Sequence, residues 1–201
     1  MSAWHYRGDP AGSSKEDPVS TVSWTIIALA VAILIAVAIQ FLRPMLRRRR
    51  LRDRFGPEYD RVVEESGGRR AGERELTGRE HRHADLHLRE LAPDRQEHYR
   101  TRWAEIQQQF VDDPADATRA ADQLVTTIMA ERGYPIENYD QRLADLSVEH
   151  STTLGHYRAA HHIATRPTGT VVSTEDRRTA LVHYRALFRD LLDSDAHNQH
   201  K

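Results

Sequence analysis

An apolar run from Trp24 to Leu42, followed at once by a cluster of arginines, limits most strongly what this chain can form. The run is close to the roughly 20 apolar residues that a helix needs to cross the hydrocarbon core of a bilayer. Residues 43–54 then hold seven arginines and a single acid, Asp53. Positive charge beside a span marks its cytoplasmic end. The sequence therefore predicts a single-pass protein of the plasma membrane, with its N-terminus outside and its C-terminal domain in the cytoplasm.

A cleaved and exported form is the alternative for this segment. Ala36-Val37-Ala38 fits the small-x-small pattern of a signal cleavage site. The flank before the run, however, carries Lys15, Glu16 and Asp17 and is net negative, whereas a secretory signal begins with positive charge. The charge distribution favours an uncleaved anchor.

The arginines after the span form a basic collar that suits anionic lipid headgroups. Each arginine near such a surface contributes roughly 1 kcal/mol of attraction. A stop-transfer signal needs the same charges, so both interpretations of the collar stay open. The residues expected at the membrane surface are Arg43, Arg47, Arg48, Arg49, Arg50, Arg52 and Arg54.

Composition excludes several classes of function for the rest of the chain. Residues 55–201 hold 20 of the 29 basic residues and 26 of the 30 acids, so this part is acidic. An acidic domain is a poor nucleic-acid binder, because phosphates must be neutralised by a basic face. The chain has no cysteine, and its only lysines are Lys15 and Lys201. Thiolate metal sites, cysteine nucleophiles and a P-loop or Schiff-base lysine are thus absent, and no cofactor is expected.

Composition shifts divide the chain into six expected segments. Residues 69–85 are almost wholly polar, which is typical of a solvent-exposed helix or a stalk. The segments are a disordered tail at 1–21, a transmembrane helix at 22–42, the basic collar at 43–56, a polar helical stalk at 57–92, a helical bundle at 93–192 and a disordered tail at 193–201.

Helical periodicity, with no convincing strand pattern, predicts an all-α fold: the transmembrane helix followed by a bundle of four to five short helices. One apolar stripe holds Tyr99, Trp103, Ile106 and Phe110. A second is capped by Asp113, begins with Pro114, continues through Ala117, Ala121, Leu124 and Ile128, and is closed by Gly133. A third is capped by Thr174 and holds Leu181, Tyr184, Phe188 and Leu191.

A fourth, weaker helix is expected over about residues 148–165. Its stripe holds His150, Leu154, Tyr157, His161 and Ala164. Histidines on an apolar stripe are usually buried and hydrogen-bonded, but a catalytic or metal-binding pair stays possible, since histidine is the usual base and ligand at neutral pH.

The segment His81-Arg82-His83-Ala84-Asp85-Leu86-His87 resembles the HxHxDH motif of metallo-β-lactamase-fold hydrolases, with one residue too many before the last histidine. That motif belongs to a loop after a buried strand, and no strand is expected here. On a helix only His83 and His87 share a face, and zinc takes at least three protein ligands. We therefore interpret the segment as a solvated helix face.

The tripeptide His-Tyr-Arg occurs at residues 98–100, 156–158 and 183–185 on expected helices. In each copy the tyrosine lies on the apolar stripe, where its ring is buried and its hydroxyl needs a polar partner. A shared polar pocket is the functional alternative to this structural role. Its candidate residues are His150, Tyr157, His161, His183 and Tyr184.

Four strings, RFGPEYDRVVEESGGRR, WAEIQQQFVDDPADATRAADQLVTTIMAERGYP, DLSVEHSTTLGHYRAAHHIA and STEDRRTALVHYRALFRDLL, resemble a family of small bacterial membrane-anchored proteins from actinobacteria and some proteobacteria. The resemblance covers roughly residues 54–192. It implies a bacterial source, a single-span anchor and a helical soluble domain. It implies no activity and no functional residues.

The expected function is a non-enzymatic, membrane-tethered interaction module that binds a protein partner or a lipid surface at the cytoplasmic face. The alternative is a membrane-anchored ligand sensor or hydrolase that uses the His/Tyr pocket. A DNA-linked regulator is disfavoured by the acidic domain and by the lack of a helix-turn-helix pattern.

Overall fold

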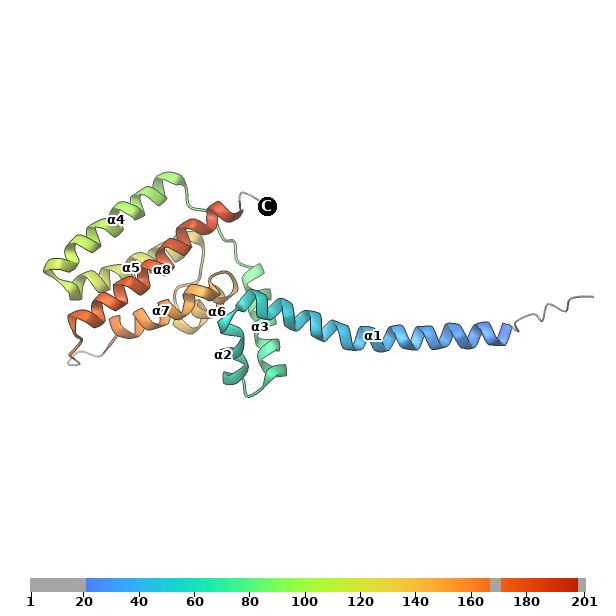
Figure 1. The fold of residues 1–201 in the computed structure, drawn as a ribbon. Coiled ribbons are helices and arrows are strands. Elements are labelled where there is room, and N and C mark those ends of the chain that lie inside the picture. Colours follow the sequence, from blue (N-terminus) through green and yellow to red (C-terminus); the bar gives the residue numbers. More distant parts are fainter. Residues whose placement is uncertain (1–20, 167–170, 199–201) are drawn as a thin grey trace, which may run out of the picture. The chain divides into compact units, whose positions relative to one another are not determined.

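The computed structural model describes residues 21–166 and 171–198, and in these ranges it holds eight helices and no strand (Figure 1). The prediction of an all-α fold is confirmed. The helices are α1 (Thr21–Phe55), α2 (Pro57–Glu65), α3 (Arg69–Ala84), α4 (Pro93–Asp112), α5 (Pro114–Arg132), α6 (Tyr139–Glu149), α7 (Ser151–Ala164) and α8 (Thr174–Asn198).

The chain divides into two compact units, of which the first ends at Leu46 and the second begins at Arg47. Within the described residues, α1 is the one helix long and apolar enough to cross a membrane, with a mean hydropathy of 2.8 over its most apolar window. The apolar side chains that the structure describes between Trp24 and Leu42 are exposed to the surroundings. By length and composition this helix fits the predicted span.

Local signals set most helix ends in the second unit. The side chain of Asp113 accepts hydrogen bonds from the backbone N–H groups of Ala115 and Asp116 at 3.1 and 2.9 Å, which caps α5 as expected. Gly133 ends α5 with a left-handed φ of 97°, and a Cβ there would lie 2.8 Å from the carbonyl oxygen of His87. A larger residue at 133 therefore meets both backbone strain and a clash.

The capping residue of α8 is Ser173, one position before the predicted Thr174. The hydroxyl of Ser173, and not that of Thr174, accepts from the backbone N–H of Asp176 at 3.0 Å, and the carboxylate of Asp176 accepts in turn from the N–H of Ser173. This reciprocal pair is a capping box, in which the capping residue lies three positions before an acidic residue. Ser173 lies three positions before Asp176, and Thr174 does not.

Helices α4, α5, α7 and α8 lie alongside one another and enclose the larger hydrophobic core (Figure 1). The predicted stripes supply much of it, because one helix face recurs every three to four residues. From those stripes the buried residues are Tyr99, Trp103, Ile106, Ala117, Ala121, Leu124, Ile128, Leu154, Tyr157, Tyr184, Phe188 and Leu191, with Phe110, Ala164 and Leu181 packed partly buried beside them.

The helix expected over about residues 148–165 corresponds to α7, which begins three residues later, at Ser151. The chain bends at His150, whose φ of −115° and ψ of 32° end α6 and begin α7. His150 therefore stands at the N-cap of α7, just before the helix, and its side chain is buried as expected for a histidine of that stripe. The sequence analysis also missed α6, which Asn138 caps by accepting from the N–H of Gln141.

A second, smaller core holds together the segment that was expected to be a collar and a stalk. It consists of Leu51, Phe55, Tyr59, Val62, Leu76 and Val148. α3 packs against α2 so closely that a Cβ on Gly72 would lie 2.7 Å from the Cα of Val63. Instead of a free stalk, α2 and α3 form a hairpin that packs on α6 and α7 (Figure 1).

The ends of the chain differ from expectation where the structure describes them. α8 continues to Asn198 instead of giving way to a tail at residue 193, because nothing from Thr174 onward is a glycine or proline that would break a helix. The tail expected at 1–21 lies outside the described residues, apart from Thr21, which begins α1.

Candidate functional site

Three of the five residues expected in a polar pocket come together in the second unit. Tyr157 and His161 lie one turn apart on α7, and Tyr184 faces them from α8. The ring centroid of Tyr157 lies 5.8 Å from that of His161 and 6.3 Å from that of Tyr184. His150 and His183 lie elsewhere, each with another partner.

The group that joins these residues is Asp122 of α5. Its Oδ1 accepts hydrogen bonds from the hydroxyl of Tyr184 at 2.8 Å and from Nδ1 of His161 at 3.1 Å. Since a carboxylate only accepts, Nδ1 of His161 carries the hydrogen, and in the neutral imidazole Nε2 then has the lone pair. An Asp–His pair of this kind orients an imidazole as a base or as a ligand.

The pair borders an open, shallow hollow of about 490 Å³ that Arg142 also lines. Arg142 donates to the hydroxyl of Tyr157 at 2.9 Å and to the carbonyl oxygen of Ile136. On another side, the ring of Tyr139 stacks on His161 with centroids 4.3 Å apart. The site thus combines a carboxylate, an imidazole and a guanidinium at one surface.

Burial and hydrogen bonding act in opposite directions on Asp122. Burial raises the pKa of its carboxyl group, but the hydrogen bonds from His161 and Tyr184 outweigh it and leave the pKa below its ordinary value of 3.8. The pKa of Tyr184 is raised, chiefly by burial and then by the adjacent carboxylate. The site therefore holds an ionised Asp122 beside a protonated Tyr184 at neutral pH.

Asp122→Asn is expected to lower the free energy of unfolding by about 1–2 kcal/mol at pH 7. A carboxyl group whose pKa is depressed on folding stabilises the fold fully above its unfolded value, and this contribution is lost as the pH falls through the folded value. The difference from the wild type should therefore shrink below about pH 4, near the ordinary pKa of 3.8. Denaturant titrations between pH 3 and 7 measure it.

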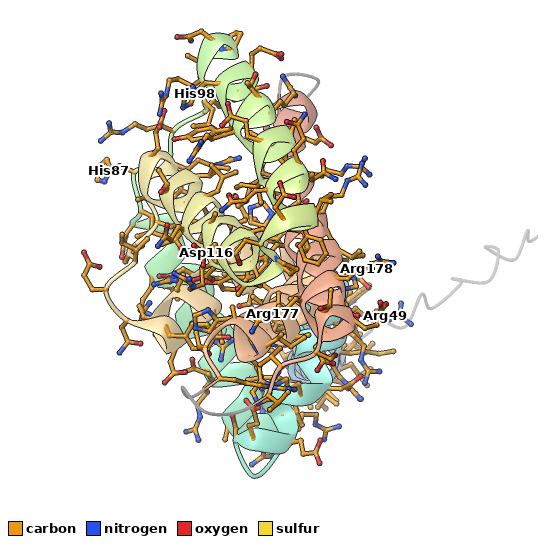
Figure 2. The ribbon with its side chains drawn as sticks, turned by 90° about the vertical axis from the view of Figure 1, so that its left-hand side faces the viewer. Arg49, His87, His98, Asp116, Arg177 and Arg178 are labelled. Atoms are coloured by element: carbon orange, nitrogen blue, oxygen red, sulfur yellow. The ribbon has the colours of Figure 1, made fainter. Side chains whose placement is uncertain are left out.

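Asp116→Asn is the matched control, since Asp116 lies on the same helix (Figure 2) and its carboxylate is half-exposed beside Arg119. It should change stability much less. Equal effects of the two variants at every pH would show that Asp122 has no special role.

His150 forms a second, separate group with α8. It is 1% exposed, and its Nδ1 donates to Oδ2 of Asp190 at 2.9 Å, an oxygen that also accepts from the hydroxyl of Thr153 at 2.5 Å. Burial raises the pKa of Asp190, and these two hydrogen bonds lower it by more. This group ties the α6–α7 bend to α8 and does not join the hollow beside Asp122.

His183 pairs with His156 instead of joining the pocket. Their Nδ1 atoms are 2.8 Å apart, with one ring donating to the other, and their rings stack at 4.9 Å. Burial, followed by the neighbouring imidazole, lowers the pKa of His183. The His-Tyr-Arg copies of α7 and α8 thus meet pairwise, histidine on histidine and tyrosine on tyrosine.

Four of the collar arginines from Arg47 onward have partners within their own unit. Arg50 and Arg54 both form ion pairs with Glu80, at 3.3 and 3.6 Å, and Arg52 pairs with Asp60 at 2.6 Å. The guanidinium of Arg47 donates to the hydroxyl of Thr77 at 2.6 Å. Exposed pairs of this kind contribute little stability, so these arginines can exchange their partners for other anions.

Arg43, Arg48 and Arg49 complete the expected membrane-surface set. Arg49 is exposed (Figure 2) and, like Arg43, makes no hydrogen bond or ion pair with a described residue. The guanidinium of Arg48 lowers the pKa of Tyr59, but burial, the largest influence, leaves that pKa above its ordinary value.

In the ranges that the structure describes, no three His, Asp or Glu side chains are arranged to hold a metal ion. The His81–His87 segment is divided by the end of α3 at Ala84. His83 is buried, with its Nε2 3.8 Å from Glu149, whereas His87 is exposed in the following extended segment (Figure 2). The two histidines do not share a helix face.

Three members of these groups were not predicted from the sequence: Asp122, Arg142 and Asp190. Each lies one position from a buried residue, at the edge of a helix's apolar face, where a charged side chain can reach inward. This position is the one signal in the sequence for these residues. It is a weak signal, because many other charged residues occupy similar edges.

Comparison with protein-family models, with curated proteins and with solved structures gave no match.

Proposed function

We propose that this protein is a single-pass membrane protein whose helical domain acts as a non-enzymatic interaction module at the cytoplasmic face. The observation that carries the proposal is α1, in which one helix contains both the apolar stretch and the arginine cluster that follows it. The cluster favours a cytoplasmic C-terminal domain. Its exposed arginines suit anionic headgroups.

Tethering supports a role in binding other membrane proteins. A domain held at the membrane searches a surface instead of a volume, which raises its effective concentration toward partners in the same membrane. The acidic balance of residues 55–201 favours a protein partner over a nucleic acid.

The anchor is tested with the full-length, C-terminally tagged protein, crosslinked mildly in its native membrane and purified for mass spectrometry. We expect a stoichiometric protein partner. Ala30→Arg/Leu34→Arg is the control, because two arginines at the centre of a span cost about 5–7 kcal/mol of insertion free energy. It should lose both the membrane fraction and the partner. A control variant that stays soluble and still captures the partner would contradict the proposal.

The orientation of the protein in the membrane is measured in the same system. The chain has no cysteine, so a single introduced cysteine is the one site at which a thiol reagent can label it. An impermeant thiol reagent on intact cells should label Ser13→Cys and leave Val111→Cys, at an 82% exposed position, unlabelled. The reverse pattern would place the domain outside.

A ligand sensor or hydrolase is the second candidate, favoured by the Asp122–His161 pair at an open hollow. It predicts a stoichiometric small molecule or metal in the same purified sample, lost in His161→Asn. A sample that holds such a bound species and no protein partner would favour the sensor or hydrolase over the interaction module.

A further inference from the structure

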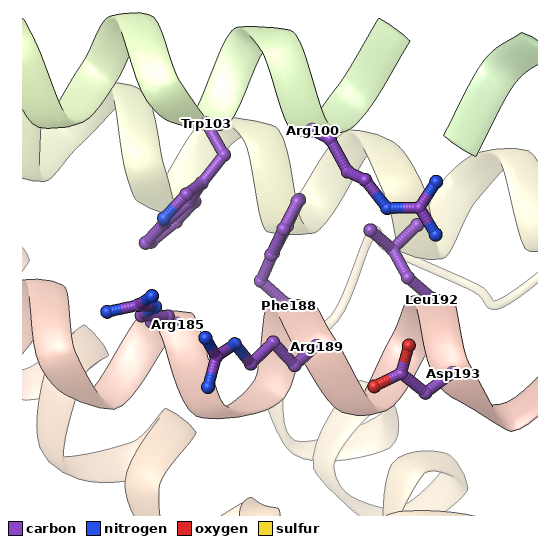
Figure 3. A pocket seen from close by; sticks show the side chains of 7 residues that line it. All are labelled: Arg100, Trp103, Arg185, Phe188, Arg189, Leu192 and Asp193. Atoms are coloured by element: carbon purple, nitrogen blue, oxygen red, sulfur yellow. The ribbon is translucent and has the colours of Figure 1, made fainter. Parts of the chain in front are cut away.

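A second cavity, of about 260 Å³, opens between α4 and α8 on the larger core (Figure 3). Its lining residues are Arg100, Trp103, Arg185, Phe188, Arg189, Leu192 and Asp193. The rings of Trp103 and Phe188 stack at 4.8 Å with an angle of 22° between their planes, and each residue is 5% exposed. They give the cavity an aromatic wall that is almost wholly buried.

The charge around this wall is positive. Three arginines face one acid, Asp193. Arg185 and Arg189 are exposed one turn apart on α8, and neither makes a hydrogen bond or ion pair with any residue that the structure describes. In Figure 3 the guanidinium group of Arg185 lies on the side of α8 toward Trp103, and that of Arg189 lies across the α8 ribbon. Like charges one helical turn apart repel each other, so this pair favours an anion between them.

Trp103 adds an unused donor. Its indole Nε1 is buried and has no hydrogen-bond partner among the described residues. A buried donor without a partner costs about 1–3 kcal/mol. Trp103 lines the cavity together with these exposed arginine side chains (Figure 3), so its N–H lies in the wall of the space that a ligand would fill.

We propose that this cavity binds a phosphate monoester with a flat apolar body. The phosphate group lies between Arg185 and Arg189, because guanidinium forks match phosphate oxygens. Its double negative charge balances the excess of positive charge among the lining residues. The apolar body packs against the Trp103–Phe188 wall, and Nε1 of Trp103 donates to the ligand. The monoester is either a soluble molecule or a lipid headgroup.

The test uses the full-length protein in nanodiscs of neutral phosphatidylcholine, titrated calorimetrically with phenyl phosphate. We expect one bound molecule per chain. Arg185→Gln/Arg189→Gln should weaken binding about tenfold or more, because it removes charge-assisted hydrogen bonds. Arg177→Gln/Arg178→Gln makes the same charge change in the first turns of α8 (Figure 2) and should leave binding unchanged.

Trp103 provides an independent readout. In a Trp4→Phe/Trp24→Phe background it is the sole tryptophan, and its emission should shift as phenyl phosphate saturates the cavity. Trp103→Phe keeps one aromatic ring but removes the indole N–H together with the second ring, and should weaken binding by a smaller factor than the arginine pair.

Phosphatidic acid in the nanodiscs distinguishes the two sources. Competition with phenyl phosphate assigns the site to a headgroup, and lack of competition assigns it to a soluble ligand. Three results would overturn the proposal: no binding of phenyl phosphate, equal weakening by the two arginine pairs, or inorganic phosphate binding as tightly as phenyl phosphate.

Discussion

Replacing Glu58 with glutamine is expected to lower the free energy of unfolding by about 3–5 kcal/mol, the largest loss from removing a single charge in the domain. Glu58 is 4% exposed. Both its oxygens accept from Arg158, each at 2.6 Å, and Arg79 lies 3.5 Å away. Glutamine keeps the shape of the side chain but leaves two largely buried guanidinium groups without their shared counter-ion.

The measurement is a denaturant titration of the full-length protein in neutral detergent, followed by helical circular dichroism. Glu65→Gln on the same helix is the control, since it breaks an exposed pair with Arg61 and should cost no more than about 0.5 kcal/mol. Similar small losses in both variants would mean that water reaches Glu58 in solution. The ionic group joins α2 and α3 to α7, so its loss should free the hairpin from the bundle.

Trp103→Ala is expected to cost about 3–5 kcal/mol, and Phe188→Ala a similar amount, because each removes a large buried ring and leaves a cavity. The two rings stack against each other between α4 and α8. A loss of this size is a large part of the stability of an ordinary domain, so partial unfolding near room temperature is the expected phenotype.

Thermal melts of the same preparation check this result. Val111→Ala on α4 is the control, at a position that is 82% exposed, and it should shift the melting temperature little. The two alanine variants should not add, because each already breaks the same stacked contact. A small shift for Trp103→Ala would show that the α4–α8 contact opens readily in solution.

The helices of the bundle follow from local chemistry, and that is why they could be predicted. Tyr99, Trp103 and Ile106 recur at helical spacing, and all three are buried. Asp113 and Gly133 bound α5 because one supplies a side-chain acceptor and the other tolerates a left-handed backbone. Such signals depend only on neighbours in sequence.

The candidate site depends on contacts between distant residues, and here sequence reasoning reached only part of the answer. The tyrosines of α7 and α8 were predicted to share a pocket because they occupy buried stripes. His183 precedes its stripe residue by one position and therefore faces another side of α8, where it meets His156. Nothing in the sequence indicates that Asp122 is the acid that joins His161 and Tyr184.

The hairpin of α2 and α3 shows the same limit. α3 has few apolar residues, and a polar stretch of this kind is typical of a solvated helix. Its attachment rests instead on Leu76 and on the pairing of Arg79 with Glu58, and the partner Arg158 lies 100 positions further along the chain. A buried ion pair at that separation has no local signature.

The division of the second unit into two hydrophobic cores has a consequence for how it opens. The smaller core has six members, and two of them, Leu51 and Phe55, belong to the last turns of α1. Few buried contacts mean a low free energy of local unfolding. Amide hydrogens of α2 and α3 should therefore exchange with solvent through a sub-global opening that leaves α4, α5 and α8 protected. Such an opening would turn the segment between the arginine cluster and the bundle into a longer linker while the bundle itself stays folded.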